Sequence, residues 1–171
     1  MHLTARTTTQ SDTLKSMKIS SSAFEHQGKI PAKYTCVGED ISPPLRFEDV
    51  PADAKSLVLI VDDPDAPMAH STGSGSSTWV HWVVFNIPPD LKEVRENSAP
   101  EGGIEGDTSF GKPGYGGPCP PSGEHRYFFK LYALSDMLTF EHLEKMNKQT
   151  VEEKMKGKIL GEAGLVGLFS K

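Results

Sequence analysis

The amino-acid sequence predicts a mostly β protein, an antiparallel β-sandwich or barrel with one or two peripheral helices near the C-terminus. Its apolar runs are short and separated by turn signals, and the 171 residues include 16 glycines and 13 prolines. This composition is typical of many turns that join short strands. Helical patterns occur only in the last third of the chain. A chain of this length forms one domain with its own core and is too short for two.

Four stretches are expected to form strands in addition to the one that contains His81. Two prolines confine the segment 42–51 to a sheet edge or to the entry of a strand. The run 57–61, "LVLIV", is unbroken and rich in β-branched residues, so it suits a strand that is buried on both faces. The run 126–134, "RYFFKLYAL", is apolar on both faces, and 164–169, "GLVGLF", is expected to close a sheet.

The segment 79–88, "WVHWVVFNIP", is a further expected strand. Successive side chains of a strand point to opposite faces. One face is therefore predicted to carry Trp79, His81, Val83 and Phe85. A lone histidine on an apolar face is more often a core residue with a satisfied ring. A half-buried histidine that titrates near neutrality can also bind an anion or carry a proton.

The helical signals lie close to the C-terminus. Thr150 and Glu153 have the spacing of a capping box and precede an apolar stripe. That stripe consists of Val151, Met155 and Ile159. Gly161 is the expected helix stop. A second helix is predicted over 140–148, on weaker evidence.

Composition and charge exclude several classes of protein. The net charge of −5 argues against a general nucleic-acid binder. No run approaches the roughly 20 apolar residues of a membrane span. Residues 1–16 lack the apolar centre of a secretory signal and are expected to be a flexible extension of a single domain over 17–171. We therefore expect a cytoplasmic protein, in which Cys36 and Cys119 are by default free thiols, with one disulfide as the alternative.

The acidic stretch 62–67, "DDPDAP", directly follows the buried run 57–61. Its three carboxylates repel one another unless donors or cations compensate them. A proline-rigidified turn, in which the aspartates bond to nearby backbone N–H groups, explains the pattern without any function. Alternatively, one carboxylate points inward and orients a histidine. The candidate histidines are His81 and His125.

His125 ends the long connection 89–125, which is rich in glycine and proline. A loop this long inside a compact domain is usually functional. Its glycines let the backbone approach a ligand closely, and successive N–H groups can form a concavity that binds an anion. The loop has too few Lys and Arg residues for a long polyanion, so a small phosphate or carboxylate fits better. The segment 70–78 is expected to be a flexible, polar, exposed lip.

The alternatives that involve catalysis or metals have weaker support. No GxSxG, HExxH or Walker motif is present. Cys119 with His125 or His81 is a nucleophile pair by residue type alone, since Cys119 lies between prolines with no helix N-terminus to lower its pKa. Asp63, His81 and His125 are acceptable metal ligands, but no closely spaced pair supports a metal site. We expect neither a cofactor nor a metal.

Three motifs, "DPDAP", "WVHW" and "GGPCPPSGEHRY", resemble in order and spacing those of the phosphatidylethanolamine-binding protein family, which includes the Raf kinase inhibitor proteins. The likeness runs from about Met17 to the end of the chain and is greatest to the bacterial and archaeal branch. It implies a β-sandwich with a small anion-binding cavity. The ligand-binding residues that it implies are Asp63, Pro67, Trp79, His81, Gly117, Pro118 and His125. The supporting residues that it implies are Asp65, Arg126 and Tyr127.

The sequence thus predicts a protein that binds a small anion, a phosphate ester or a phospholipid head group, without acting as an enzyme. Asp63 would orient and charge one histidine, while the other histidine and the loop N–H groups donate to the anion. The alternative is a regulator that inhibits a protease or kinase through its surface, with the lip 70–78 as the contact. Hydrolase activity ranks below both. A protein partner and a homodimer stay open.

Overall fold

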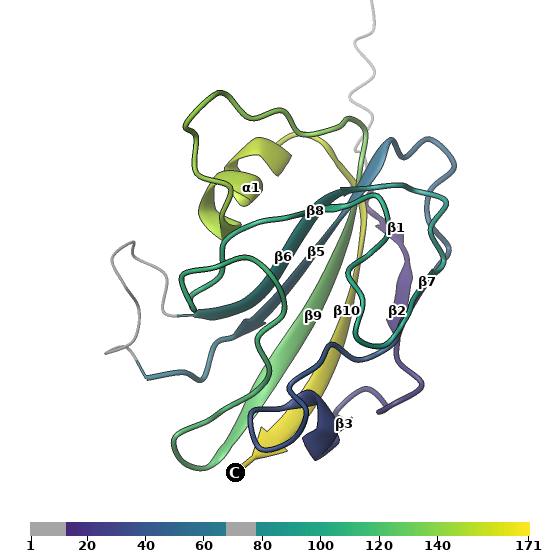
Figure 1. Cartoon of the computed structure of the whole chain (residues 1–171). Coiled ribbons are helices and arrows are strands. Elements are labelled where there is room, and N and C mark those ends of the chain that lie inside the picture. Colours follow the sequence, from purple (N-terminus) through teal and green to yellow (C-terminus); the bar gives the residue numbers. More distant parts are fainter. Residues whose placement is uncertain (1–12, 68–77) are drawn as a thin grey trace, which may run out of the picture.

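The computed structural model describes residues 13–67 and 78–171 and contains two β-sheets (Figure 1). The larger sheet has the order β1 (Lys15–Ser16), β10 (Ile159–Ser170), β9 (Glu124–Leu134), β5 (Ser56–Asp63), β6 (Trp79–Ile87) and β8 (Ile104–Glu105), and β3 (Gly28–Lys29) also pairs with β10. The smaller sheet consists of β2 (Lys18–Ser20), β4 (Leu45–Glu48) and β7 (Glu93–Val94). The described helices are the 3-10 helix η1 (Ala32–Tyr34) and α1 (Lys148–Met155).

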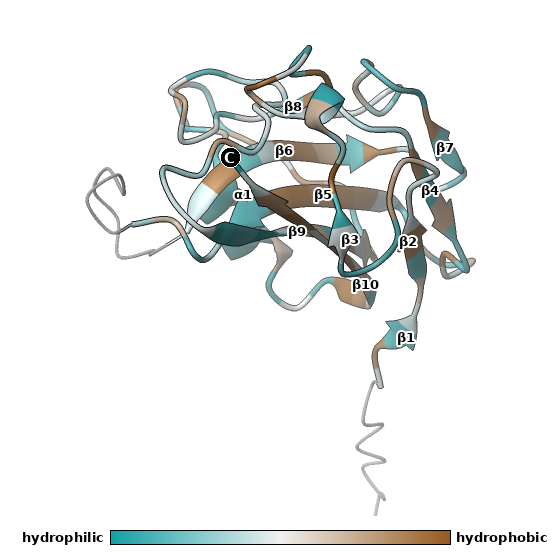
Figure 2. Ribbon diagram, turned by 90° about the horizontal axis from the view of Figure 1, so that it is seen from below, coloured by the Kyte–Doolittle hydropathy of each residue, from teal (hydrophilic) through white to brown (hydrophobic). Residues whose placement is uncertain are grey.

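The two open sheets confirm the predicted β-sandwich. The long strands β10, β9, β5 and β6 pair antiparallel in that order, whereas the short strands β1 and β3 run parallel to β10. The inner faces of both sheets share one apolar cluster, which includes Ile19 and Phe47 from the smaller sheet and Leu59 and Phe129 from the larger one. Figure 2 shows these apolar bands along the facing strands.

Strand β5 lies in the middle of the larger sheet and is covered on both faces. Each residue of 57–61 is at most 1% exposed, which confirms the prediction made from its unbroken apolar run. Leu59 faces the core between the sheets, whereas Ile60 belongs to a second apolar cluster on the outer face. Val151 and Met155 of α1 complete that second cluster, so the helix covers the outside of the sheet.

The helix prediction is correct in place but wrong in its limits. Asn147 is the N-cap, and its side chain accepts the N–H of Thr150 while the Thr150 hydroxyl accepts the N–H of Asn147. This reciprocal pair starts the helix earlier than the predicted Thr150–Glu153 box, and α1 ends at Met155. The predicted helical residues Ile159 and Gly161 belong to β10 instead.

The second predicted helix, over 140–148, does not form. The segment consists of turns and irregular backbone up to Asn147, and Leu143 adopts a left-handed φ of 72° that an α-helix does not contain. Only its last residue, Lys148, enters α1. The structure therefore has one helix near the C-terminus among the residues that it describes.

The predicted side-chain alternation of β6 is wrong after His81 because the strand is bulged there. The pairing with β5 shifts register at this point and leaves His81 without a partner residue. The extra residue reverses the alternation that follows it. Trp82 therefore faces the core between the sheets, and Val83 and Phe85 face the cluster beneath α1. The bulge frees His81 from the strand pattern and separates it from the two apolar residues predicted to share its face.

Cys36 and Cys119 form a disulfide, so the default expectation of two free thiols is wrong. That expectation depended on an assumed reducing compartment and not on geometry. The bridge joins the segment after η1 to the Gly/Pro-rich connection, where the N–H of Cys36 also donates to the Pro118 carbonyl at 3.1 Å. The N–H of Gly117 donates to Asp40 at 2.7 Å. Two segments that are far apart in sequence are thus tied side by side.

The described chain begins at residue 13, and β1 already pairs with β10, although the sequence predicts an extension over 1–16. Residues 1–12 and most of the lip 70–78 lie outside the described residues, so both expectations stay predictions. Within the described ranges, no helix has the length and apolar character needed to cross a membrane.

Candidate functional site

A cavity of about 210 Å³ lies where the C-terminal end of β5 meets the start of β6 and the start of β9. Its polar groups come from Asp63, His81, His125 and Tyr127. Its other walls are apolar and are formed by Ala66, Pro67, Trp79, Phe110, Cys119, Pro120 and Pro121. The cavity therefore has a small polar region within a largely apolar wall, which is the usual construction of a site for a small ligand.

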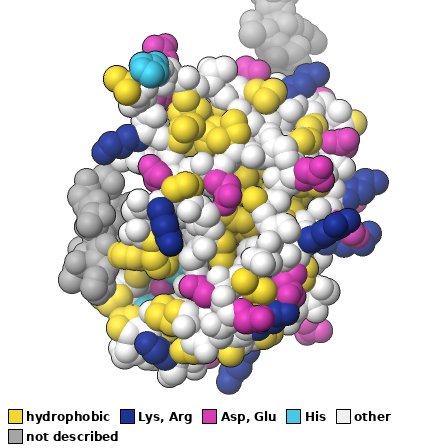
Figure 3. Space-filling view, in the orientation of Figure 1, with side chains coloured by type: hydrophobic (Ala, Val, Ile, Leu, Met, Phe, Trp, Pro, Cys, Tyr) yellow, Lys and Arg dark blue, Asp and Glu magenta, His cyan; other side chains and the backbone are white. Residues whose placement is uncertain are grey.

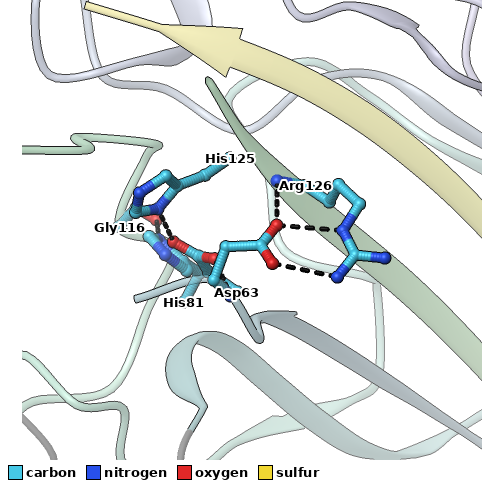
Figure 4. A network of polar contacts seen from close by, with 6 residues as sticks. Asp63, His81, Gly116, His125 and Arg126 are labelled. Atoms are coloured by element: carbon cyan, nitrogen blue, oxygen red, sulfur yellow. Dashed lines mark hydrogen bonds and ion pairs between the residues drawn. The ribbon is translucent and has the colours of Figure 1, made fainter. Parts of the chain in front are cut away.

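Asp63 and His125 form a buried pair in this cavity (Figure 4). Asp63 is the last residue of β5, and His125 follows the loop that leads into β9. The Asp63 Oδ2 atom lies 2.7 Å from His125 Nδ1, and the Asp63 Oδ1 atom accepts the backbone N–H of Asp65 at 2.8 Å. The residues are 3% and 7% exposed. Because a carboxylate accepts the Nδ1 hydrogen, the Nε2 atom of His125 is the one left for a ligand.

His81 is held by a different acceptor. Its Nδ1 atom lies 2.7 Å from the carbonyl oxygen of Gly116, which can only accept, so Nδ1 carries the hydrogen. Burial lowers the pKa of His81 below its ordinary value, and the hydrogen bond to Gly116 and the nearby aspartates oppose this effect only in part. The ring also packs edge-on against Tyr127 and Phe110, with centroid distances of 5.2 and 5.5 Å.

Tyr127 contributes a buried hydroxyl to the same cavity. Its side chain is 1% exposed, and the hydroxyl makes no hydrogen bond of normal geometry among the described residues. Burial raises the pKa of Tyr127, followed by the charges of Asp63 and Asp65, while the backbone N–H of Cys119 opposes the rise. The phenol therefore keeps its proton, and its oxygen is sealed from solvent. The resemblance implies only a supporting position for this residue, yet it lines the cavity.

Asp65 and Arg126 lie behind this group, as the resemblance implies for supporting residues. The Arg126 Nε and Nη2 atoms each lie 2.9 Å from a carboxylate oxygen of Asp65, and the backbone N–H of Arg126 makes a third bond (Figure 4). The hydrogen bond from Arg126 lowers the pKa of the Asp65 carboxyl. The pair joins the turn after β5 to the first residues of β9.

The glycine- and proline-rich loop is placed differently from what the resemblance implies. Gly117 and Pro118 are buried against the segment that contains Asp40, and neither lines the cavity. The loop lines it instead with Cys119, Pro120 and Pro121. The other implied contacts, Pro67 and Trp79, do line it.

Sequence reasoning missed several lining residues. Ala66 lies inside the quoted "DPDAP" motif and could have been included with Pro67. Phe110 comes from the middle of the long connection, and no pattern in the sequence distinguishes it from other loop residues. Among the residues that the structure describes, no group of three or more His, Cys, Asp or Glu side chains is arranged to hold a metal ion.

Comparison with protein families matches residues 20–170 to the phosphatidylethanolamine-binding protein family. A UPF0098 protein of Methanothermobacter thermautotrophicus is 49% identical over 160 residues, which cover 91% of this chain and 99% of that protein. The crystal structure of a putative phosphatidylethanolamine-binding protein homologue from Chlamydia trachomatis is 42% identical, with a TM-score of 0.83 over 91% of this chain and 98% of that one.

A second solved structure is similar at lower identity. The Escherichia coli protein YbcL, described as a member of the mammalian family, is 27% identical, with a TM-score of 0.78 over 91% of this chain and 98% of that one. The matches cover almost the whole described fold, including the strands that carry the cavity. This chain belongs to the phosphatidylethanolamine-binding protein family.

Proposed function

We propose that the protein binds a small anion, the phosphate of a monoester or of a phosphorylated head group, in the cavity between Asp63, His81 and His125, and that it does so without catalysing a reaction. One observation carries this proposal. The His81 Nε2 atom and the His125 Nε2 atom both belong to cavity-lining side chains, and neither makes a hydrogen bond within the described protein. Unused polar atoms in a largely buried site fit a polar ligand.

The Asp63–His125 pair can supply the charge that an anion needs. When the His125 ring takes a second proton, its Nε2–H donates to the anion while Asp63 balances the positive charge. The charge of this pair is confined to the cavity. Figure 3 shows acidic and basic side chains interspersed over the described surface in that view, which suits a small ligand better than a long polyanion.

The disulfide weakens the competing hydrolase hypothesis. Cys119 is bonded to Cys36 and cannot act as a thiolate nucleophile in this state. The hypothesis of a surface inhibitor depends on the lip 70–78, most of which lies outside the described residues, and no contact in the structure favours it. A cytoplasmic location also stays a prediction.

Titration calorimetry with phosphorylethanolamine tests the proposal. We expect the unmodified protein to bind, and His125→Ala or His81→Ala to abolish measurable binding. His142→Ala is a matched control, since His142 is exposed and is not part of the cavity lining. Unchanged binding in both cavity variants would refute the proposed site.

A further inference from the structure

The two cavity histidines are each held through the Nδ1 atom, but by different kinds of hydrogen-bond acceptor. His125 bonds to the carboxylate of Asp63, whereas His81 bonds to the neutral carbonyl of Gly116. A neutral His81 with its hydrogen on Nδ1 has a bare lone pair on Nε2. That atom accepts hydrogen bonds and does not donate them.

The Nε2 atom of His81 is open toward the cavity. It has no hydrogen-bond partner among the described residues, and it is not among the side-chain atoms that are sealed from solvent without one. Those sealed atoms are the Oδ1 of Asp62 and the hydroxyl of Tyr127. A ligand in the cavity therefore meets a hydrogen-bond acceptor at His81, whereas the Nε2 atom of His125 donates whenever that ring carries a second proton.

The surroundings of His81 favour its neutral ring. The residue is 3% exposed, and its ring faces Phe110 and Tyr127, which carry no charge. The charged groups that act on it are Asp62 and Asp63 of β5 and Asp40 of the segment bridged to the loop. These carboxylates favour the charged ring, but burial outweighs them and the pKa of His81 is lowered. His125 of β9 balances the nearest carboxylate, Asp63, when it is protonated.

We propose, building on the anion site above, that the pocket selects a phosphate monoester in its singly protonated form, whose P–OH group donates to His81 Nε2 while another of its oxygens accepts from His125. A phosphodiester and a sulfate ester each carry one negative charge but no proton to donate. Both would place a lone pair of the ligand against the lone pair of His81. The intact phosphodiester of a phospholipid is therefore the poorer ligand, and a monoester head group is the better one.

The size of the preference follows from the lost contact. A hydrogen bond to a charged group contributes about 1.5–3 kcal/mol, so its loss weakens binding by about tenfold or more. A ligand without the proton could restore the bond only by protonating His81, which burial opposes. The second pKa of a phosphate monoester is about 6, so at that pH roughly half of the ligand carries the required proton.

The test compares three ligands that share the ethanolamine ammonium group, by calorimetry with the full chain at about pH 6. They are phosphorylethanolamine, ethanolamine O-sulfate and glycerophosphorylethanolamine. We expect the monoester to bind about tenfold more tightly than the sulfate ester and the diester. His81→Gln, whose amide can donate as well as accept, should reduce the preference to within about threefold, while His142→Gln leaves it unchanged.

The outcomes separate this inference from the function on which it rests. Binding of all three ligands within about threefold of one another would overturn the inference and leave the anion site standing. Failure of all three to bind would refute the anion site itself. The comparison in the unmodified protein decides between these results even if His81→Gln does not fold.

Discussion

Breaking the disulfide between Cys36 and Cys119 should destabilise the protein strongly. The bridge spans 83 residues of sequence and fastens the cavity wall at Cys119, Pro120 and Pro121 to the segment after η1. Both half-cystines are exposed, so a reducing agent can reach them without unfolding the core. The Cys36→Ser, Cys119→Ser double variant removes the bridge permanently, and its serine hydroxyls are polar groups that suit these exposed positions.

The magnitude follows from the length of the closed loop. A crosslink across 83 residues removes chain entropy from the unfolded state that corresponds to about 4.5 kcal/mol at 25 °C in the loop-closure treatment. For a protein of this size, each kcal/mol changes the unfolding temperature by about 2–4 °C. We therefore expect the double variant to unfold at a temperature lower by about 9–18 °C.

Thermal unfolding followed by circular dichroism is the assay, with alkylation and mass spectrometry to establish the state of the two cysteines. Dithiothreitol should lower the unfolding temperature of the unmodified protein toward that of the double variant. The double variant itself should not respond, which controls for other effects of the reagent. A change below about 3 °C on verified reduction would refute the reasoning, because the bridge would then constrain little.

Three further predictions concern single groups. Gly117→Ala should destabilise the protein by more than about 2 kcal/mol in denaturant unfolding, because its Cβ would lie 2.3 Å from Asp40 Oδ1 and 2.5 Å from the Tyr34 carbonyl oxygen. A variant as stable as the parent would contradict this close approach at Gly117. In nitrogen-detected NMR, His81 should keep its hydrogen on Nδ1 and titrate below its ordinary pKa of 6.5. The free energy of unfolding should then fall as the pH drops below 6.5, because the unfolded ring takes a proton first. An Nε2–H tautomer at neutral pH would refute this assignment. Burial raises the pKa of Tyr132 to about 12, so the free energy of unfolding should fall as the pH rises from 10 to 12, because the unfolded phenol ionises first. The tyrosinate absorbance of the native protein tests this. It should show no group with an ordinary pKa near 10, since all four tyrosines have raised pKa values.

The strands were the most predictable part of the fold because their signal is local. The run 57–61 is apolar throughout, and a strand with a sheet neighbour on each edge and a layer on each face needs that pattern. The helix limits were less predictable because two capping candidates compete within a few residues. The Asn147–Thr150 pair satisfies both backbone groups reciprocally, and the chain from Ile159 onward gains a full edge of pairing with β9.

The site was predictable only where a motif fixed the geometry. Spacing in the sequence cannot bring Asp63, His81 and His125 together, and the family resemblance supplied that expectation. The bulge at His81 was hidden because β6 is apolar on both faces, so an alternation that reverses at one extra residue cannot be seen in the sequence. The disulfide was hidden for a related reason, since its two halves meet through loops whose paths depend on the whole fold.

The acidic stretch 62–67, which follows the run 57–61, shows how the fold relieves the repulsion between three neighbouring carboxylates. Adjacent strand residues point to opposite faces, so Asp62 and Asp63 are separated by the sheet itself. Asp62 faces the side of α1, where Lys130 and Lys148 lie 3.0 and 2.7 Å from its Oδ2 atom.

Asp63 faces the cavity and is balanced by His125, while Asp65 turns outward to Arg126. Each carboxylate thus has its own compensating cation or donor. The two that meet permanent cations serve structure, because Lys148 ties α1 to the sheet and Arg126 fixes the turn after β5. Asp63 alone is paired with a side chain whose charge depends on a single proton. That difference makes Asp63 the carboxylate able to adjust to an incoming anion.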